Sequence, residues 1–183
     1  MKKAMKVILS VLLLIVLMIG ATVNTYAFTV ERTDTIDNDD AQGYDNSRSG
    51  FDTLLKASTL YYQDARTQVC NSDWNYYRYH LSKGYSRYTP IYGKVSAYLY
   101  NVKFTDPEAY YTISSVTSVC DPPAGYINQD LAAAGWNEIG TAENNIQHAT
   151  KKYVTLYATV QASQNHSTKT CGADAIKVEL GYN

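Results

Sequence analysis

Strict alternation of apolar and polar side chains in the last third of the chain is the strongest constraint on the fold. Between Tyr153 and Ala162 every second residue is aliphatic or alanine, and the residues between them are tyrosine, threonine or glutamine. A period of two places the two sets on opposite faces of an extended strand. One apolar and one amphipathic face are typical of a sheet covered on one side. The predicted inward set is Val154, Leu156, Ala158, Val160 and Ala162.

Other runs predict further strands. They are rich in tyrosine, threonine, serine and β-branched residues, and turn residues separate them. This pattern predicts a mainly β fold with at most one or two short helices. An antiparallel β-sandwich is our first prediction and a β-barrel the second. The additional predicted strands are 74–81, 85–92, 95–102, 110–119 and 176–182, with a hairpin connection at 82–84.

Two segments are ambiguous at the level of sequence. Residues 51–69 fit both an alternating strand and a helical stripe, and the β runs that follow favour the strand. Between residues 121 and 150 the period weakens. There, residues 130–134 predict one helical turn, ended by Gly135, within a longer loop.

The first 27 residues have the layout of a secretory signal peptide. Three lysines precede an almost unbroken apolar stretch, and Thr25-Tyr26-Ala27 places small residues where cleavage is expected. An uncleaved membrane anchor is the alternative, but residues 7–23 are fewer than the roughly 20 apolar residues that a span needs. We therefore expect a secreted, extracellular protein without a stable membrane anchor after cleavage.

Beyond the signal peptide the chain divides into two parts. Residues 28–50 hold six acidic residues and few apolar ones, which indicates a flexible acidic arm. Residues 51–183 contain the predicted strands and are expected to form a single β-rich domain.

Three cysteines follow the signal peptide: Cys70, Cys120 and Cys171. Thiols outside the cell tend to oxidise, so one disulfide and one remaining thiol are expected. Sequence leaves all three pairings open, and we favour Cys120–Cys171, with Cys70 free or available for an intermolecular bond. A catalytic thiolate would need a partnered histidine, and His166 is the candidate nearest to Cys171 in sequence.

Charge is unevenly distributed along the domain. Residues 66–104 hold six basic residues and one acidic residue, whereas residues 105–147 hold six acidic residues and no basic one. Alternating bases and tyrosines in the first segment would suit an anionic wall polymer, a glycan or a protein as partner, through ion contacts and ring stacking. The alternative is that these tyrosines are ordinary half-buried strand residues with the hydroxyl in water. Opposite charges on one molecule also permit an oligomer. The predicted binding residues are Tyr77, Arg78, Tyr79, Tyr85, Arg87 and Tyr88.

Motifs of common enzymes are absent from the sequence. There is no Gly-x-Ser-x-Gly elbow, no His-Glu-x-x-His helix and no phosphate-binding glycine loop. The three histidines lack metal-ligand spacing, so we expect neither a metal nor a cofactor, and nothing favours nucleic acid as a partner. Asp106 and Glu108 are close in sequence but flank Pro107, which indicates a turn more than a catalytic pair.

In layout the chain resembles small secreted proteins of Gram-positive bacteria. The shared features are a lysine-rich signal peptide, a polar arm, a β domain rich in Tyr, Ser and Thr, and a short final strand. The resemblance implies an exported β domain and transfers no active-site residue. We predict a secreted non-enzymatic binding module acting at the bacterial cell envelope or on an extracellular glycan or protein. A bacteriocin-like toxin and an extracellular hydrolase without a recognisable motif are the alternatives.

Overall fold

The computed structural model describes residues 28–38, 47–71, 75–81, 91–100, 103–115, 123–144 and 156–182. The predicted signal peptide therefore lies outside the described residues, as does the predicted hairpin connection at 82–84. No helix in the described part of the chain is long and apolar enough to cross a membrane.

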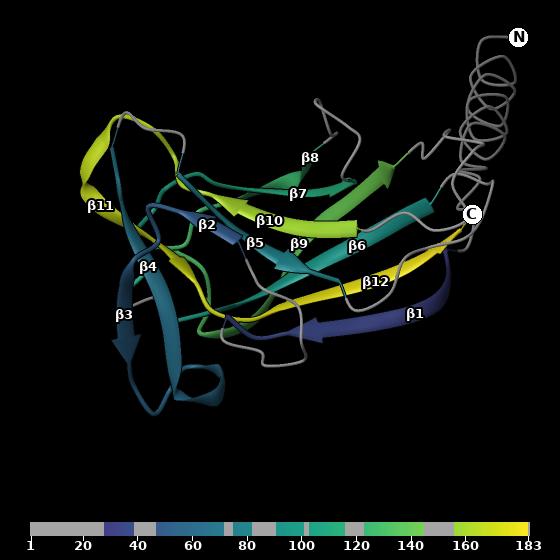
Figure 1. Cartoon of the computed structure of the whole chain (residues 1–183), viewed down its shortest axis with the longest axis horizontal. Coiled ribbons are helices and arrows are strands. Elements are labelled where there is room, and N and C mark those ends of the chain that lie inside the picture. Colours follow the sequence, from purple (N-terminus) through teal and green to yellow (C-terminus); the bar gives the residue numbers. More distant parts are fainter. Residues whose placement is uncertain are drawn as a thin grey trace, which may run out of the picture.

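Antiparallel strands form three sheets, as the sequence predicts for a β-sandwich (Figure 1). A four-stranded sheet has the order β1-β12-β6-β9, and a five-stranded sheet has the order β2-β5-β10-β7-β8. The bounds of the first sheet are Thr29–Ile36 (β1), Ile176–Tyr182 (β12), Ile91–Leu99 (β6) and Gly135–Asn144 (β9). Those of the second are Ser47–Ser49 (β2), Tyr76–His80 (β5), Leu156–Gln161 (β10), Ala109–Ser115 (β7) and Pro123–Ile127 (β8).

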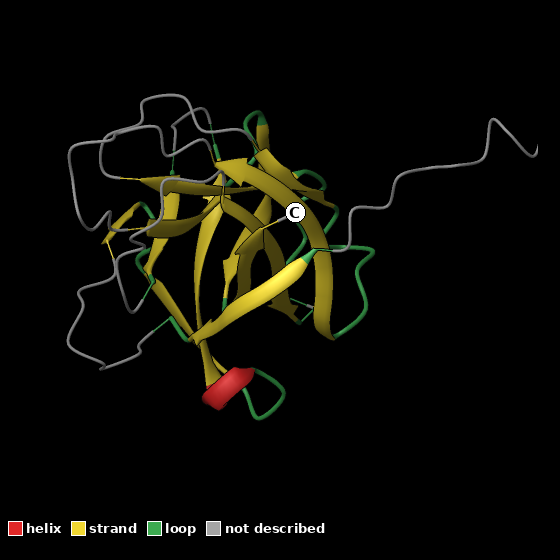
Figure 2. Cartoon of the chain, turned by 90° about the vertical axis from the view of Figure 1, so that its right-hand side faces the viewer, coloured by secondary structure: helices red, strands yellow, loops and turns green. Residues whose placement is uncertain are grey.

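A smaller sheet lies at one end of the sandwich, at the left of Figure 1. Its order is β11-β4-β3, with bounds His166–Ala173, Asp64–Cys70 and Thr53–Lys56. The short 3-10 turn η1, Tyr61–Gln63, joins β3 to β4 and is the red turn in Figure 2. Residues 51–69 are thus mostly extended, which confirms the preference for strand over helix.

The core lies between the four-stranded and five-stranded sheets. Strand β10 has the predicted alternation, because Leu156, Ala158 and Val160 are fully buried and the residues between them are half-buried. The sheets approach closely at Gly93 of β6, where a side chain would overlap Ile113 of β7. Each buried aliphatic side chain contributes about 1.5–3 kcal/mol to folding. The inward residues of the other strands include Tyr77, Tyr79, Val95, Ala97, Leu99, Tyr111, Ile113, Ile176, Val178 and Leu180.

The prediction of a flexible arm is wrong for the first part of residues 28–50, because Thr29–Ile36 forms strand β1. It pairs along β12 at the edge of the four-stranded sheet. Its charged residues are accommodated there: Arg32 forms an ion pair with the buried Asp34 at 2.8 Å, and Ile36 enters the core. Charged side chains are a usual feature of edge strands, which explains why composition alone indicated disorder.

The predicted loop between residues 121 and 150 is also wrong in part, since it contains strands β8 and β9. Strand β9 is a polar edge strand that pairs with β6 over nearly its whole length. The helical turn predicted at 130–134 is not formed; a turn lies two residues earlier, where the Ala132 N–H donates to the carbonyl of Asn128 at 3.0 Å. Gly135 follows with φ +108°, a conformation that glycine adopts without strain.

Candidate functional site

The six residues predicted to bind a partner do not form one surface. Tyr77 and Tyr79 are buried in the core, with 1% and 2% of their surface exposed, and their rings lie 5.0 Å apart. The Tyr79 hydroxyl donates to the Asp174 carbonyl at 3.1 Å, and the Tyr77 hydroxyl donates to the Asn38 carbonyl. The prediction is therefore wrong for these two tyrosines, because neither ring is open to a ligand. Tyr85, Arg87 and Tyr88 lie outside the described residues.

Arg78 points to the opposite, outer face of β5, as the alternation of the strand requires. Its guanidinium carbon lies 5.1 Å from the ring centre of Tyr76 and 5.1 Å from that of Tyr157 on β10. Both distances are within the range of cation–π attraction. The His80 ring stacks on Tyr157 at 4.8 Å with an interplanar angle of 17°. Arg78 is thus the centre of an aromatic group on the outer face.

Strand register places this group in line with residues of the neighbouring strands. Gln161 of β10 is opposite Tyr76 on one side and opposite Tyr110 of β7 on the other. Tyr110 is in turn opposite Tyr126 of β8. Residues opposite one another in a ladder project to the same face of the sheet. We call the row Tyr76–Gln161–Tyr110–Tyr126 the tyrosine row.

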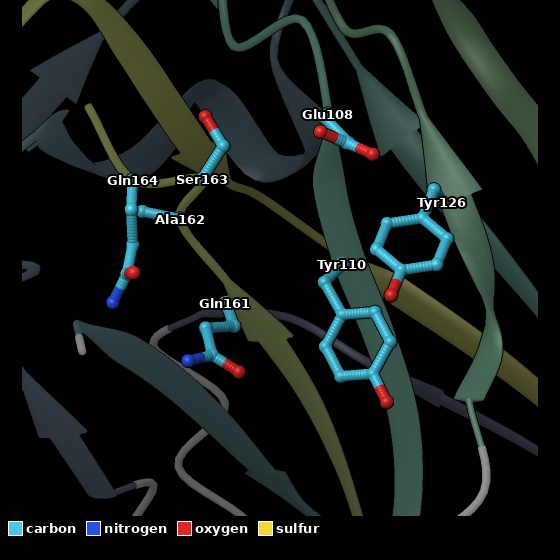
Figure 3. A pocket seen from close by; sticks show the side chains of 7 residues that line it. All are labelled: Glu108, Tyr110, Tyr126, Gln161, Ala162, Ser163 and Gln164. Atoms are coloured by element: carbon cyan, nitrogen blue, oxygen red, sulfur yellow. The ribbon is translucent and has the colours of Figure 1, made fainter. Parts of the chain in front are cut away.

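A pocket of about 450 Å³ opens at the Tyr110–Tyr126 end of the tyrosine row (Figure 3). The two rings lie 4.7 Å apart with an interplanar angle of 39°, and 57% of Tyr126 is exposed. Polar side chains from the start of β7 and the end of β10 complete the walls. The lining residues are Glu108, Tyr110, Tyr126, Gln161, Ala162, Ser163 and Gln164.

Asp106 fixes the two segments that carry these polar side chains. One carboxylate oxygen accepts the Glu108 N–H at 2.9 Å, and the other accepts the Ser163 N–H, also at 2.9 Å. Asp106 itself has no exposed surface. It therefore positions the pocket wall and is inaccessible to a substrate, and the expected turn at Pro107 is present.

Cys70 and Cys171 lie close to Asp106 and are both fully buried. Burial, with the charge of Asp106, raises the pKa of the Cys70 thiol to about 12 and that of Cys171 well above its ordinary value. A catalytic thiolate needs the opposite shift, and the exposed His166 is opposite Cys70 in the ladder, not Cys171. Both thiols are free. The favoured Cys120–Cys171 disulfide is therefore not formed in this structure, and Cys120 lies outside the described residues.

A second aromatic group, which the sequence did not reveal, lies on the four-stranded sheet. Tyr61 of η1, Tyr98 of β6 and Trp136 of β9 are mutual neighbours, with ring centres 5.4–5.5 Å apart. The Lys177 ammonium lies 5.3 Å from the Trp136 ring. Trp136 meets both tyrosine rings edge-on, the two tyrosine rings are tilted relative to each other, and 39% of Trp136 remains exposed. We regard it as a packing cluster that holds η1 on the sheet.

Residues that could ligate a metal do not come together in the described ranges, where no group of three or more His, Cys, Asp or Glu has suitable geometry. Of the residues that line the pocket, the sequence did not single out Tyr110, Tyr126 or Gln164, and it drew attention to Glu108 only as a partner of Asp106. One sequence pattern pointed to this surface: the residues predicted to face outward in strand 153–162, which include Tyr157 and Gln161. The register needed to connect this set with Tyr110 is not encoded locally.

The chain matches no protein-family model and no curated protein. Among solved structures it is similar to a family 35 carbohydrate-binding module from Clostridium thermocellum, with 12% identity, coverage of 81% of this chain and 98% of that module, and a TM-score of 0.46. It is also similar to the xylan-binding module CBM15, with 11% identity, coverage of 81% and 97%, and a TM-score of 0.43. For the K3 adhesin domain of Lys-gingipain from Porphyromonas gingivalis, the identity is 12%, the coverage 82% and 92%, and the TM-score 0.35. With such identities and all TM-scores below 0.5, these similarities assign no ligand to this chain.

Proposed function

We propose that the protein is a secreted, non-catalytic module that binds a carbohydrate in the pocket at Tyr110 and Tyr126. The observation that carries the proposal is the pairing of two accessible tyrosine rings with amide and carboxylate side chains in one pocket. Secretion rests on the predicted signal peptide at residues 1–27. The glycan would belong to the cell envelope or to the extracellular medium.

The chemistry of the lining suits a sugar. A pyranose ring has apolar C–H faces, which pack on aromatic rings, and hydroxyl groups around its edge, which both donate and accept hydrogen bonds. Tyrosine supplies a rigid apolar face with a polar tip. Gln161 and Gln164 offer donors and acceptors, and Glu108 offers acceptors. A volume of about 450 Å³ is within the usual range for small-molecule pockets.

The same lining argues against glycoside hydrolysis in this pocket. That reaction ordinarily uses two carboxyl groups, one on each side of the scissile bond. Glu108 is the one carboxylate among the residues that line the pocket. Asp106 is nearest in sequence, but it is buried and both its oxygens accept backbone N–H groups. Binding without turnover is therefore the function that this geometry supports best.

Substitution of Tyr110 by alanine tests the proposal. Removal of one stacking ring should weaken binding at least about ten-fold, which corresponds to roughly 1.4 kcal/mol. The measurement is affinity electrophoresis and calorimetry against a panel of soluble plant and bacterial polysaccharides. Tyr62→Ala is the control, because Tyr62 is 77% exposed on η1 and does not line the pocket. Equal affinity of wild type and Tyr110→Ala for every bound polymer would contradict the proposed site.

A further inference from the structure

We propose that the binding surface continues from the pocket along the tyrosine row to Arg78, and that Arg78 receives an anionic group on the bound glycan. The inference rests on the proposed function and specifies the class of ligand. The ligand would be a linear carbohydrate polymer with carboxylate or phosphate groups along its chain.

Continuity of the surface follows from the strand register. Gln161 lines the pocket and is also opposite Tyr76, whose ring lies against the Arg78 guanidinium. The tyrosine row crosses four adjacent strands, β5, β10, β7 and β8. With a strand spacing of about 4.8 Å, the row is about 14 Å long, which is longer than a single sugar ring. A polymer seated in the pocket would therefore extend over the outer face of the sheet, in the direction of β5.

Arg78 has the charge and the geometry for an anion. Its contacts with Tyr76 and Tyr157 are ring contacts, which hold the guanidinium in place without neutralising it. Within the described residues, no carboxylate forms an ion pair with Arg78, and its Nε–H is buried without a hydrogen-bond acceptor. A planar guanidinium held by two rings can donate two parallel hydrogen bonds to a carboxylate or phosphate.

In the part of the chain that the structure describes, the outward residues that the register places around Arg78 carry no opposing charge. His80 is beside Tyr157, and desolvation lowers the pKa of its imidazole, so it is neutral at pH 7. Thr159, directly opposite Arg78 on β10, and Thr112, the next residue across on β7, are uncharged. Glu108 lies at the pocket end of the surface. The surface thus has an acceptor at one end and a cation towards the other, an arrangement suited to a chain of both neutral and acidic units.

The test compares polymers that share a backbone and differ in charge. Wild type, Arg78→Gln, Arg78→Lys and Tyr110→Ala are titrated calorimetrically with polygalacturonate and with its methyl ester, and with glucuronoxylan and unsubstituted xylan. Purified wall teichoic acid is the polymer that tests phosphate as the anionic group. Lys177→Gln is the matched control, because Lys177 also lies over an aromatic ring but on the other sheet. Urea unfolding checks that each variant is folded.

If Arg78 binds the anion, wild type prefers the acidic member of a pair, and added salt weakens that preference. Arg78→Gln should lower the ratio of acidic to neutral affinity about ten-fold, which corresponds to about 1.4 kcal/mol. Arg78→Lys should restore part of it, and Lys177→Gln should leave both affinities unchanged. Preference for teichoic acid over the uronates would identify phosphate as the anion.

Two results would overturn the inference, and they are distinguishable. If acidic and neutral polymers bind equally in wild type and in Arg78→Gln, while Tyr110→Ala still abolishes binding, the pocket is correct and the Arg78 subsite is wrong. If no polymer is bound, or if Tyr110→Ala binds all of them as wild type does, the proposed function fails and the inference fails with it.

Discussion

Asp174 is an ionisable side chain in the core, with 2% of its surface exposed. One carboxylate oxygen accepts the Tyr61 N–H at 3.1 Å, and the other has no hydrogen-bond partner among the described residues. Burial, reinforced by the negative charges of Asp37 and Asp64, raises the pKa of Asp174 to about 8. The carboxyl is therefore largely protonated in the folded protein at neutral pH, whereas in the unfolded chain, with a pKa of about 3.9, it is ionised.

This difference predicts that stability falls as pH rises. Between about pH 4 and pH 8 the folded state holds a proton that the unfolded state has lost, so Asp174 reduces the free energy of unfolding by up to about 1.4 kcal/mol per pH unit. Above pH 8 its contribution is constant. Asp174→Asn should flatten the profile and be more stable than wild type at pH 8. Urea unfolding at pH 5, 6.5 and 8 measures this, and the exposed Asp52→Asn is the control. A wild-type slope retained in Asp174→Asn would contradict the prediction.

In strand β5, whether a residue faces inward or outward decides whether it packs in the core or lies on the surface. Tyr76 and Arg78 are half-buried on the outer face, whereas Tyr77 and Tyr79 fill the core. Composition identified the strand as rich in tyrosine, which is correct, since three of its five residues are tyrosine. It did not identify which tyrosines face inward, because both sets have the same chemistry and a period of two fits either assignment.

At the scale of elements, the segment between β8 and β9 is attached to β11 by the buried side chain of Gln129 and by an exposed ion pair between Asp130 and Lys169 at 3.0 Å. The Gln129 side-chain N–H groups donate to the Gly172 carbonyl at 3.0 Å and to the Tyr111 hydroxyl at 3.2 Å. Its side-chain oxygen accepts the Gly172 N–H at 2.9 Å. Gln129 is fully buried, and it satisfies both backbone groups of Gly172 as a neighbouring strand would. The amide thus joins the five-stranded sheet to the small sheet.

Gln129→Ala should consequently destabilise the protein by about 2–4 kcal/mol, because it leaves the backbone of Gly172 buried without partners and opens a cavity. The midpoint of urea unfolding reports the loss. Gln68→Ala, which removes a half-buried amide from β4, should cost less than about 1 kcal/mol. Similar effects of the two substitutions would show that the Gly172 bonds contribute little.

Two of the elements that the sequence did not predict, β1 and β9, are edge strands. Strands β1 and β9 lie at the two edges of the four-stranded sheet, and both are polar. Each carries an ion pair: Arg32 with Asp34 within β1, and Glu138 of β9 with Lys94 of the neighbouring β6 at 2.7 Å. An edge strand needs only one apolar face and one paired side, so its sequence resembles that of a loop.

At the scale of the whole molecule, β1 belongs to the folded domain. We predict that a chain beginning at Asp37 is less stable than one beginning at Phe28 by about 3 kcal/mol or more, because it loses the backbone pairing with β12 and the burial of Ile36. Calorimetric and urea unfolding of the two chains measures the difference. Equal stability would restore the interpretation of residues 28–36 as an arm without a structural role.

The sequence by itself determined the class of fold and much of the core. Alternation identified the extended segments and the inward set of β10, since side chains on a strand must alternate between faces wherever it lies. It also located the turn at Pro107.

The tertiary structure alone decided the candidate site. Tyr110 and Tyr126 meet because β7 and β8 pair at one register, and Gln161 completes the wall because β10 lies on the other side of β7. Pairing between strands far apart in sequence depends on the packing of the whole sheet, which no local pattern specifies. The same is true of Arg78, whose role depends on the Tyr157 ring that β10 places beside it.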